Sequence, residues 1–353
     1  MPLGIVISVG GTPDAELSEA AQVVVEEGMM APARFQLVYS EDIDGAGDLP
    51  HLSDARLGPG SDIMVVAGAP DGPQCLIKGP VHGQRIVLAH GGEGSSVEVR
   101  GSDTSITLDR ESKTEVWAEG PDSMAVQAIL QRQYSASIDV EKTHSEYQDS
   151  KHALAQCATD FDFVTMLARR NGANFWITCN ELGIETAHFK RPDTAQDAAY
   201  TLTINQDPPT VTEVEIEWDT EAPVSAVLRG IDPASKSVLN GDVAQSPLSP
   251  LGNKALSAVA AGASSIHIAP PADSAGNLKS RGESALIDAG WFVHARCNTS
   301  VEALGGIVRP HTVVTLAGAG SRHSGDYYVA NVRHEIDAEA HRMNLTLIRN
   351  AWG

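Results

Sequence analysis

The centre of this chain reads Gln156-Cys-Ala-Thr-Asp-Phe-Asp-Phe-Val-Thr-Met-Leu-Ala-Arg-Arg-Asn-Gly172 and predicts one helix that leads into one hairpin. Thr159 or Asp160 can cap the helix start, and Asp162 adds an acid to the first turn. The apolar residues Phe161, Val164, Leu167 and Ala168 fall on one face at helical spacing, and Gly172 ends the helix. Two strands follow, with a turn at residues 180–183 between them. We expect this unit to be structural, because it contains no pattern of catalytic residues.

The end of the chain predicts an antiparallel hairpin. After a turn at residues 325–326, Tyr328 and every second residue to Ile336 alternate with Tyr327 and every second residue to Arg333. Beyond a polar turn at residues 337–340, Met343, Leu345 and Leu347 line one face of a partner strand. The two strands therefore suit each other as neighbours in a sheet.

These segments resemble the tail hub proteins of contractile phages, of the late control protein D type, and the hub half of type VI secretion and contractile injection spike proteins. The matching residues are Asp160, Phe161, Asp162, Phe163, residues 167–170, Gly172, residues 189–192 and the closing strands from Arg309. The resemblance is weakest over the first 70 residues and over residues 242–274. In one departure, Arg309-Pro-His-Thr312 stands where hub sequences often carry Arg-Pro-Gly-Asp. That difference loosens the turn assignment but not the strand.

A short internal repeat supports a duplicated fold. Arg100-Gly101-Ser-Asp103 matches Arg229-Gly230-Ile-Asp232, and in both copies an apolar strand enters the motif and a polar segment leaves it. Gly-Asp turns are common, so a chance match stays open as an alternative. The resemblance favours the other interpretation, since hub proteins carry two related tube barrels in each subunit.

The sequence and the resemblance together predict an α+β fold with two related antiparallel barrels. We expect the first tube-type barrel at residues 1–112, a mixed α/β domain at 113–196 and the second barrel at 197–241 and 291–353. Residues 242–290 are expected to form an insertion with a helix, because residues 242–274 are rich in Ala, Ser, Pro and Gly. Early strands are expected at residues 6–9, 33–39, 63–67, 75–78, 85–88 and 96–100. A second helix is expected after Trp117, capped by the side chain of Asp122 or Ser123 and carrying an apolar face from Val126 to Tyr134.

Charge and composition exclude several classes of protein. The chain of 353 residues carries 25 Lys plus Arg against 46 Asp plus Glu, for a formal net charge of −21, which repels phosphate backbones. It lacks a signal peptide pattern and any apolar run long enough for a bilayer, so we expect a soluble chain without membrane insertion. Cys75, Cys157, Cys179 and Cys297 form no CxxC pair, which suits buried thiols in a reducing cytoplasm better than a disulfide framework or zinc site.

Catalytic motifs are absent from the sequence. None of the 12 His lies in a His-Glu-x-x-His motif, and neither a Gly-x-Ser-x-Gly elbow nor a Walker loop occurs. We therefore expect a protein that is not an enzyme and that needs no cofactor or metal. Trp352 at the C-terminal end is expected either to be held by a neighbouring chain or to belong to a frayed tail.

The resemblance implies a structural baseplate hub in the virion tail, assembled in the cytoplasm of the bacterial host. Its partners would be two further copies in a homotrimer, a separate central spike protein, the tail tube protein, and tape measure and wedge proteins. The trimer would adapt a sixfold tube to a threefold spike, and DNA would pass through its channel without specific binding. Two alternatives stay open: the hub of a phage-derived injection or type VI-like secretion device and, more distantly, a tail-associated cell-wall hydrolase.

Overall fold

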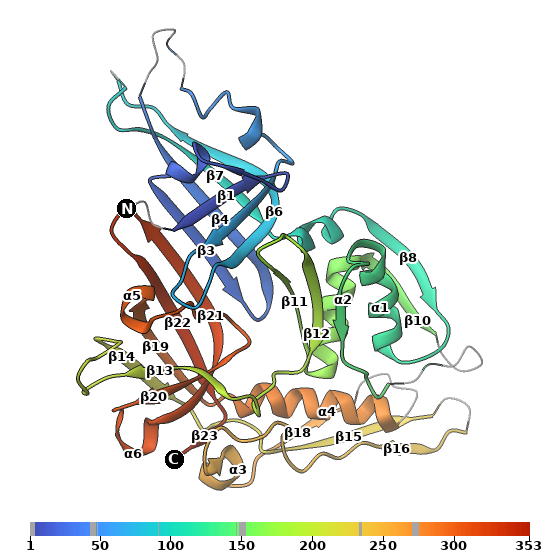
Figure 1. Ribbon diagram of the computed structural model, residues 1–353. Helices are drawn as coiled ribbons and strands as arrows, with labels where there is room; N and C mark the ends of the chain where they lie inside the picture. Colours follow the sequence, from blue (N-terminus) through green and yellow to red (C-terminus); the bar gives the residue numbers. More distant parts are fainter. Residues whose placement is uncertain are drawn as a thin grey trace.

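The computed structural model describes residues 4–42, 47, 49–90, 92–145, 147, 153–232, 235–269 and 275–353. The described chain is mostly antiparallel β-structure with a smaller number of helices, which confirms the α+β class (Figure 1). Residues 270–274 of the predicted insertion lie outside the described residues.

A sheet of 13 strands joins the two ends of the chain. Its first half contains β1 (Ile5–Val9), β2 (Thr12–Asp14), β3 (Gln22–Gly28), β4 (Ala31–Glu41), β5 (Asp62–Ala67), β6 (Gln74–Val87) and β7 (Ser95–Ser102). Its second half contains β13 (Ala198–Thr203), β14 (Val214–Trp218), β19 (Val293–Ser300), β20 (Val313–Ala317), β21 (Gly325–Asp337) and β22 (His341–Arg349). The halves merge because β21 pairs antiparallel with β3, and one apolar core lies under both.

The two halves repeat one order of neighbouring strands. The first half runs β3-β4-β7-β6-β5-β1, and the second runs β14-β19-β22-β21-β20-β13. Taken in chain order, the six strands of one half correspond one by one to the six of the other. The pairing differs at the last position, where β1 lies antiparallel to β5 but β13 lies parallel to β20. Closure of each half into a barrel stays a prediction.

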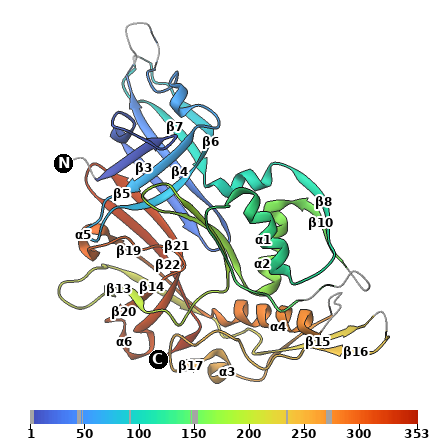
Figure 2. The same ribbon diagram turned by 45° about the vertical axis from the view of Figure 1, so that its right-hand side comes forward.

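The middle of the chain forms a separate layer beside the first half, green in Figures 1 and 2. It contains η3 (Thr104–Asp109), β8 (Ser112–Trp117), α1 (Asp122–Gln133), β9 (Ile138–Val140), β10 (Leu154–Thr159), α2 (Asp160–Asn171), β11 (Asn174–Cys179) and β12 (Glu185–Lys190). The predicted helix and hairpin are confirmed. The Thr159 hydroxyl accepts the N–H of Asp162 at 3.1 Å, and Gly172 ends α2 with a φ of 66°. Since Pro121 precedes α1, the expected side-chain cap by Asp122 or Ser123 is wrong.

A third layer lies beneath the middle one and contains α4 (Ala275–Gly290) with a small sheet of β15 (Ser225–Ile231), β16 (Val238–Asn240) and β18 (Ser265–Ile268) (Figure 1). The helix expected in this region is confirmed, and Leu278, Leu286 and Ile287 on it are buried. The remaining elements are short: η1 (Leu17–Glu19), η2 (Ala55–Leu57), β17 (Lys254–Ala255), α3 (Leu256–Val259), α5 (Val301–Leu304), α6 (Gly320–His323) and β23 (Ala351–Trp352).

The Arg-Gly-x-Asp repeat does not mark equivalent strands, so that interpretation is wrong. Arg100 and Gly101 lie on β7 inside the large sheet, whereas Arg229 and Gly230 lie on β15 in the small one. The surroundings also differ, because Gly101 is pressed against the Phe35 ring while Gly230 faces Leu278 on α4. The duplication is seen in strand order and is not carried by this motif.

The strands of the first half differ from the expectation at β3 and at β6. β3 was not predicted, although Val23, Val24 and Val25 in it are buried. Residues 75–78 and 85–88 were expected as two strands, but residues 74–87 form the single strand β6. Gly79 and Gly83 look like turn residues, yet Gly79 lets the strand approach the Asp103 backbone closely, and a register shift separates Val81 from Gly83.

Candidate functional site

The two halves of the sheet meet at a buried ionic cluster. Arg309, in the loop before β20, donates from Nε to one Glu27 carboxylate oxygen at 2.9 Å and from Nη2 to the other at 2.6 Å. The same guanidinium donates to the carbonyl oxygens of Cys75 and Leu76 on β6. The Arg309 side chain therefore links the closing part of the chain to β3 and β6 of the first half.

Two histidines complete this cluster. His334 Nε2 lies 3.1 Å from the Glu27 carboxylate, and His334 Nδ1 lies 3.0 Å from Nε2 of His341. Because an ionised carboxylate can only accept, His334 donates from Nε2 and its Nδ1 accepts from His341. Both rings are then neutral, which fits their burial.

The pKa values in the cluster follow from burial and charge. Burial opposes ionisation of Glu27, but the Arg309 guanidinium and the hydrogen bond from His334 outweigh it and hold the Glu27 pKa below its usual value. Burial lowers the pKa of His334, against the attraction of Glu27. Burial, helped by His334, lowers the pKa of His341 to about 3. The cluster is thus one ion pair with neutral histidines beside it.

A disulfide joins Cys75 on β6 to Cys179 on β11, with 5.7 Å between the Cα atoms. The expectation of four buried free thiols is therefore wrong for this pair. It is also wrong for Cys157, which is exposed, while Cys297 is a buried thiol. The two bonded cysteines are 104 residues apart, so only the packing of β11 against β6 brings them together.

Next to the disulfide, Trp176 lies between two histidine rings. Its ring stacks on His311 with 3.8 Å between the centroids and on His188 with 4.7 Å. His311 has a φ of 65°, a left-handed conformation that favours glycine. His311, which stands where hub sequences often carry Gly, therefore keeps the backbone conformation of a glycine turn. Stacking on the Trp176 ring stabilises its larger side chain. A cavity of about 200 Å³ lies here, between Arg309, His311 and Trp176.

The predicted α2 residues divide between core and surface. Phe163 and Leu167 are buried in the core of the middle layer, Phe161 is half-buried against Phe175, and Asp162 is exposed. Asp160 is buried and forms an ion pair with Lys113 on β8. None of these residues joins the ionic cluster, and their role in an interface stays a prediction.

The Arg-Gly-x-Asp residues also lie apart from one another. Arg100 pairs with Glu98, whereas Arg229 pairs with Asp242. Asp103 is buried and caps η3, and burial raises its pKa to about 6 against the hydrogen bonds from Ser105 and Ala33. Asp232 accepts a hydrogen bond from Ser235.

The C-terminal aromatic residues pack within the chain. Tyr327 and Tyr328 on β21 are buried, and Tyr328 lies against Trp291. Trp352 on β23 meets Trp218 edge to face with 5.2 Å between the centroids, and the Arg322 guanidinium lies 4.9 Å from its ring centroid. β23 pairs with β17, so the frayed-tail alternative is wrong. An additional contact of Trp352 with a neighbouring chain stays a prediction.

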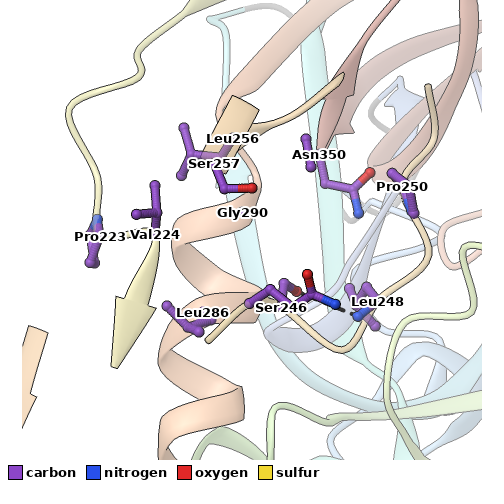
Figure 3. Close-up of a pocket in the computed structure, with 12 residues that line it drawn as sticks. Pro223, Val224, Ser246, Leu248, Pro250, Leu256, Ser257, Leu286, Gly290 and Asn350 are labelled. Atoms are coloured by element: carbon purple, nitrogen blue, oxygen red, sulfur yellow. Dashed lines mark hydrogen bonds between the residues drawn. The ribbon is translucent and has the colours of Figure 1, made fainter. Parts of the chain in front are cut away.

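A second cavity, of about 220 Å³, lies where the end of α4 meets α3 and the residues before β15 (Figure 3). Ser246, Ser257 and Asn350 supply polar groups, and Leu256 and Leu286 supply apolar ones. None of its lining side chains is acidic, basic or imidazole, so the lining offers no general acid or base and no base that could activate a serine hydroxyl.

The described part of the chain has neither a cluster of metal-binding side chains nor a membrane-spanning helix. Across residues 4–353, with the gaps stated above, no group of three or more His, Cys, Asp or Glu side chains could hold a metal ion. Within the same ranges, no helix has the length and apolar character needed to span a bilayer. The prediction that the protein needs no metal stays a prediction.

Solved structures share this fold over nearly the whole chain. The tail protein from Neisseria meningitidis MC58 has a TM-score of 0.69 at 14% identity, covering 99% of this chain and 97% of that one. The 43 kDa tail protein of prophage MuSo2 from Shewanella oneidensis has a TM-score of 0.68 at 13% identity, covering 98% of each chain. A type VI secretion component of E. coli, which exhibits structural similarity to the T4 tail proteins gp27 and gp5, has a TM-score of 0.59 at 13% identity, covering 97% and 76%.

These similarities identify a class of fold, namely that of phage tail proteins and of a type VI secretion component. The resemblance predicted from the sequence is confirmed at this level. The chain belongs to the family described as the Alg8 N-terminal domain, whose model matches residues 3–338. No curated protein matches it in sequence.

Proposed function

We propose that this protein is the structural hub of a contractile baseplate, in which three copies join a tail tube to a central spike. The observation that carries the proposal is the repeated strand order of the two sheet halves. Three copies would bring six similar halves into one ring, which can match a sixfold tube on one side and a threefold spike on the other. In this function the geometry of the ring takes the place of catalysis.

The domain division belongs to the same proposal. The first tube-type domain would occupy residues 1–112, the mixed domain residues 113–196, and the second tube-type domain the strands between residues 197 and 353 that join the large sheet. The insertion was expected at residues 242–290, with residues 197–241 in the second barrel. We propose that it begins at residue 225 instead, since β15 and β16 lie outside the large sheet and share a separate small core with β18 and α4.

The net charge supports a passive channel. A formal charge of −21 on each chain would repel DNA and let it pass without binding. The location that follows is the tail of a virion, after assembly in the host cytoplasm. The hub of a type VI-like device is a second candidate, favoured by the fold shared with the E. coli secretion component.

Electron microscopy of the protein with its tube and spike partners tests the proposal. We expect a ring of three copies between tube and spike, with an open axial channel. A dimer, or a monomer that binds neither partner, would overturn it. A murein digestion assay tests the hydrolase alternative, and we expect no release of reducing ends or soluble peptides.

A further inference from the structure

Several strand edges of the large sheet have no ladder partner among the described residues, including those of β2 and β13. Two further open edges correspond to the edges of β21 and β3 that pair with each other within the chain. One is the second part of β6, residues 82–87, which pairs with β7 on one side after the β5 pairing ends at Pro80. The other is β14, which ends the strand order and pairs with β19 alone. Another chain can pair with such an edge, because the N–H and C=O groups along it have no partner in a ladder.

Both edges expose apolar side chains. Ile86 is 42% exposed, Leu88 is 68% exposed, and Trp218 on β14 is 49% exposed. Within the chain, the edge of β21 is covered by β3, and the residues that correspond to Ile86 and Leu88 there, His334 and Ile336, are buried. The same type of edge is therefore covered in one half and open in the other.

The register shifts in β6 and β21 align these two strands residue by residue. β6 and β21 each carry a register shift, between Val81 and Gly83 and between Val329 and Asn331. Counting onward from Gly83 and Asn331 places Arg85 on Arg333, Ile86 on His334 and Leu88 on Ile336.

β14 corresponds to β3 in the same way. In the first half, Val23 of β3 lies opposite Leu37 of β4, which lies opposite Val99 of β7. In the second half, Val214 of β14 lies opposite Cys297 of β19, which lies opposite Leu345 of β22. Val99 and Leu345 face Gln84 and Val332, which are equivalent by the count from the register shift. Val214 is thus placed on Val23, Ile216 on Val25 and Glu217 on Glu26.

We propose that residues 82–88 of one copy pair antiparallel with β14 of the next copy, as β21 pairs with β3 within the chain. In the chain, Arg333 faces Glu26 and forms an ion pair with it. Transfer of that register places Arg85 opposite Glu217 of the next copy.

The apolar residues match in the same register. Ile86 falls opposite Ile216, and Leu88 falls opposite Val214. Arg85, whose side chain is 63% exposed and makes one contact with Glu98 at 3.5 Å, can reach the new partner. The transferred register therefore places one charged pair and two apolar pairs opposite each other. The register itself was set from the strand order and the register shifts, without reference to the type of side chain.

Each copy would supply residues 82–88 to one neighbour and β14 to the other, so the contact is heterologous. Such a contact builds a ring when the rotation from one copy to the next closes. This inference rests on the proposed hub function for closure at three copies. The strand pairing itself follows from the equivalence of the two halves, and it names the residues between copies.

A cysteine-trapping experiment tests the pairing. In a Cys157→Ser background, which removes the exposed thiol, Ile86→Cys and Ile216→Cys chains are mixed under mild oxidation, both alone at high concentration and assembled with tube and spike. We expect a covalent mixed dimer only on mixing, and a covalent ring from a chain that carries both substitutions. Met166→Cys, an exposed position on α2, replaces Ile216→Cys in the control.

Charge reversal gives a second measurement. Arg85→Glu or Glu217→Arg should weaken association about tenfold per interface, and the double variant should regain most of it, because the ion pair is restored in reverse. Arg110→Glu and Glu181→Arg, at exposed positions elsewhere, serve as matched controls. Equal effects of test and control variants would overturn the pairing.

The outcomes separate the two proposals. A three-copy ring without the cross-link overturns the strand pairing and leaves the hub function standing. A cross-linked filament or a larger ring supports the pairing and overturns the three-copy hub. Cross-linking of Ile86→Cys to a tube subunit instead would show that another protein covers the edge and would overturn the pairing between copies.

Discussion

Arg309 and Glu27, which are 282 residues apart, form a buried ion pair at the junction of the two sheet halves. The Glu27 residue is 8% exposed, and its carboxylate also accepts from His334. Removal of one partner leaves an uncompensated charge in the interior, which is far more costly than loss of a surface pair.

We expect Glu27→Gln to lower the free energy of unfolding by about 3 to 5 kcal/mol. Glu26→Gln is the matched control, because Glu26 is the neighbouring residue and it pairs with Arg333 at the surface, where the two side chains are 45% and 41% exposed. That variant should change stability by less than about 1 kcal/mol. Urea unfolding of both variants measures the difference, and equal effects would contradict a stabilising junction.

The disulfide should stabilise the attachment of the middle layer to the first half. Because Cys75 and Cys179 close a long loop, Cys75→Ser is expected to cost about 2 to 5 kcal/mol. Reducing agent should lower the melting temperature of the unmodified protein and leave that of Cys75→Ser/Cys179→Ser unchanged. Cys157→Ser, at an exposed free thiol, is the control. Insensitivity of the unmodified protein to reduction would refute this role.

The apolar face of α2 is expected to stabilise the middle layer. Leu167 is fully buried and Met166, the preceding residue, is 41% exposed. Leu167→Ala should therefore cost about 2 to 5 kcal/mol, whereas Met166→Ala should cost less than about 1 kcal/mol. Thermal and urea unfolding test this, and an unchanged midpoint for Leu167→Ala would show that the helix face contributes little.

Stability should fall in acid because His341 is buried as a neutral ring. Its pKa of about 3 in the folded state lies below the unfolded value of about 6.5. The stabilisation is therefore present above pH 6.5 and is lost as the pH falls toward 3, by on the order of 2 kcal/mol at pH 5. Asp103 acts in the opposite direction, since burial raises its pKa to about 6 and its contribution is lost as the pH rises through that value.

His341→Gln separates these contributions. We expect this variant to lose less stability than the unmodified protein between pH 7 and pH 5, while His90→Gln, at an exposed histidine, should follow the unmodified protein. Urea unfolding at the two pH values measures the slopes. Parallel slopes for all three proteins would exclude His341 as the source of acid sensitivity.

Local signals determined the elements with strong periodicity or caps. The α2 helix, its hairpin and the pair β21–β22 follow from apolar spacing, a Thr cap and Gly172, which act within a few residues of each other. Local signals give a wrong prediction at β6, which was expected as two strands. Gly79 and Gly83 resemble turn residues when the distant residues that pack against them are unknown. β3 was not recognised, although its run of three valines was a readable signal.

The sequence by itself determined the fold class, the acidic charge and the resemblance to tail hub proteins, since these depend on composition and on short-range patterns. Tertiary structure alone decided the disulfide, the Arg309–Glu27 pair and the place of β15 outside the large sheet. Each joins residues far apart in the chain, and their contact depends on how strands and layers pack. No local property of Cys75 selects Cys179 rather than Cys157 or Cys297, because a disulfide requires close Cα atoms, which only the packed β6 and β11 provide.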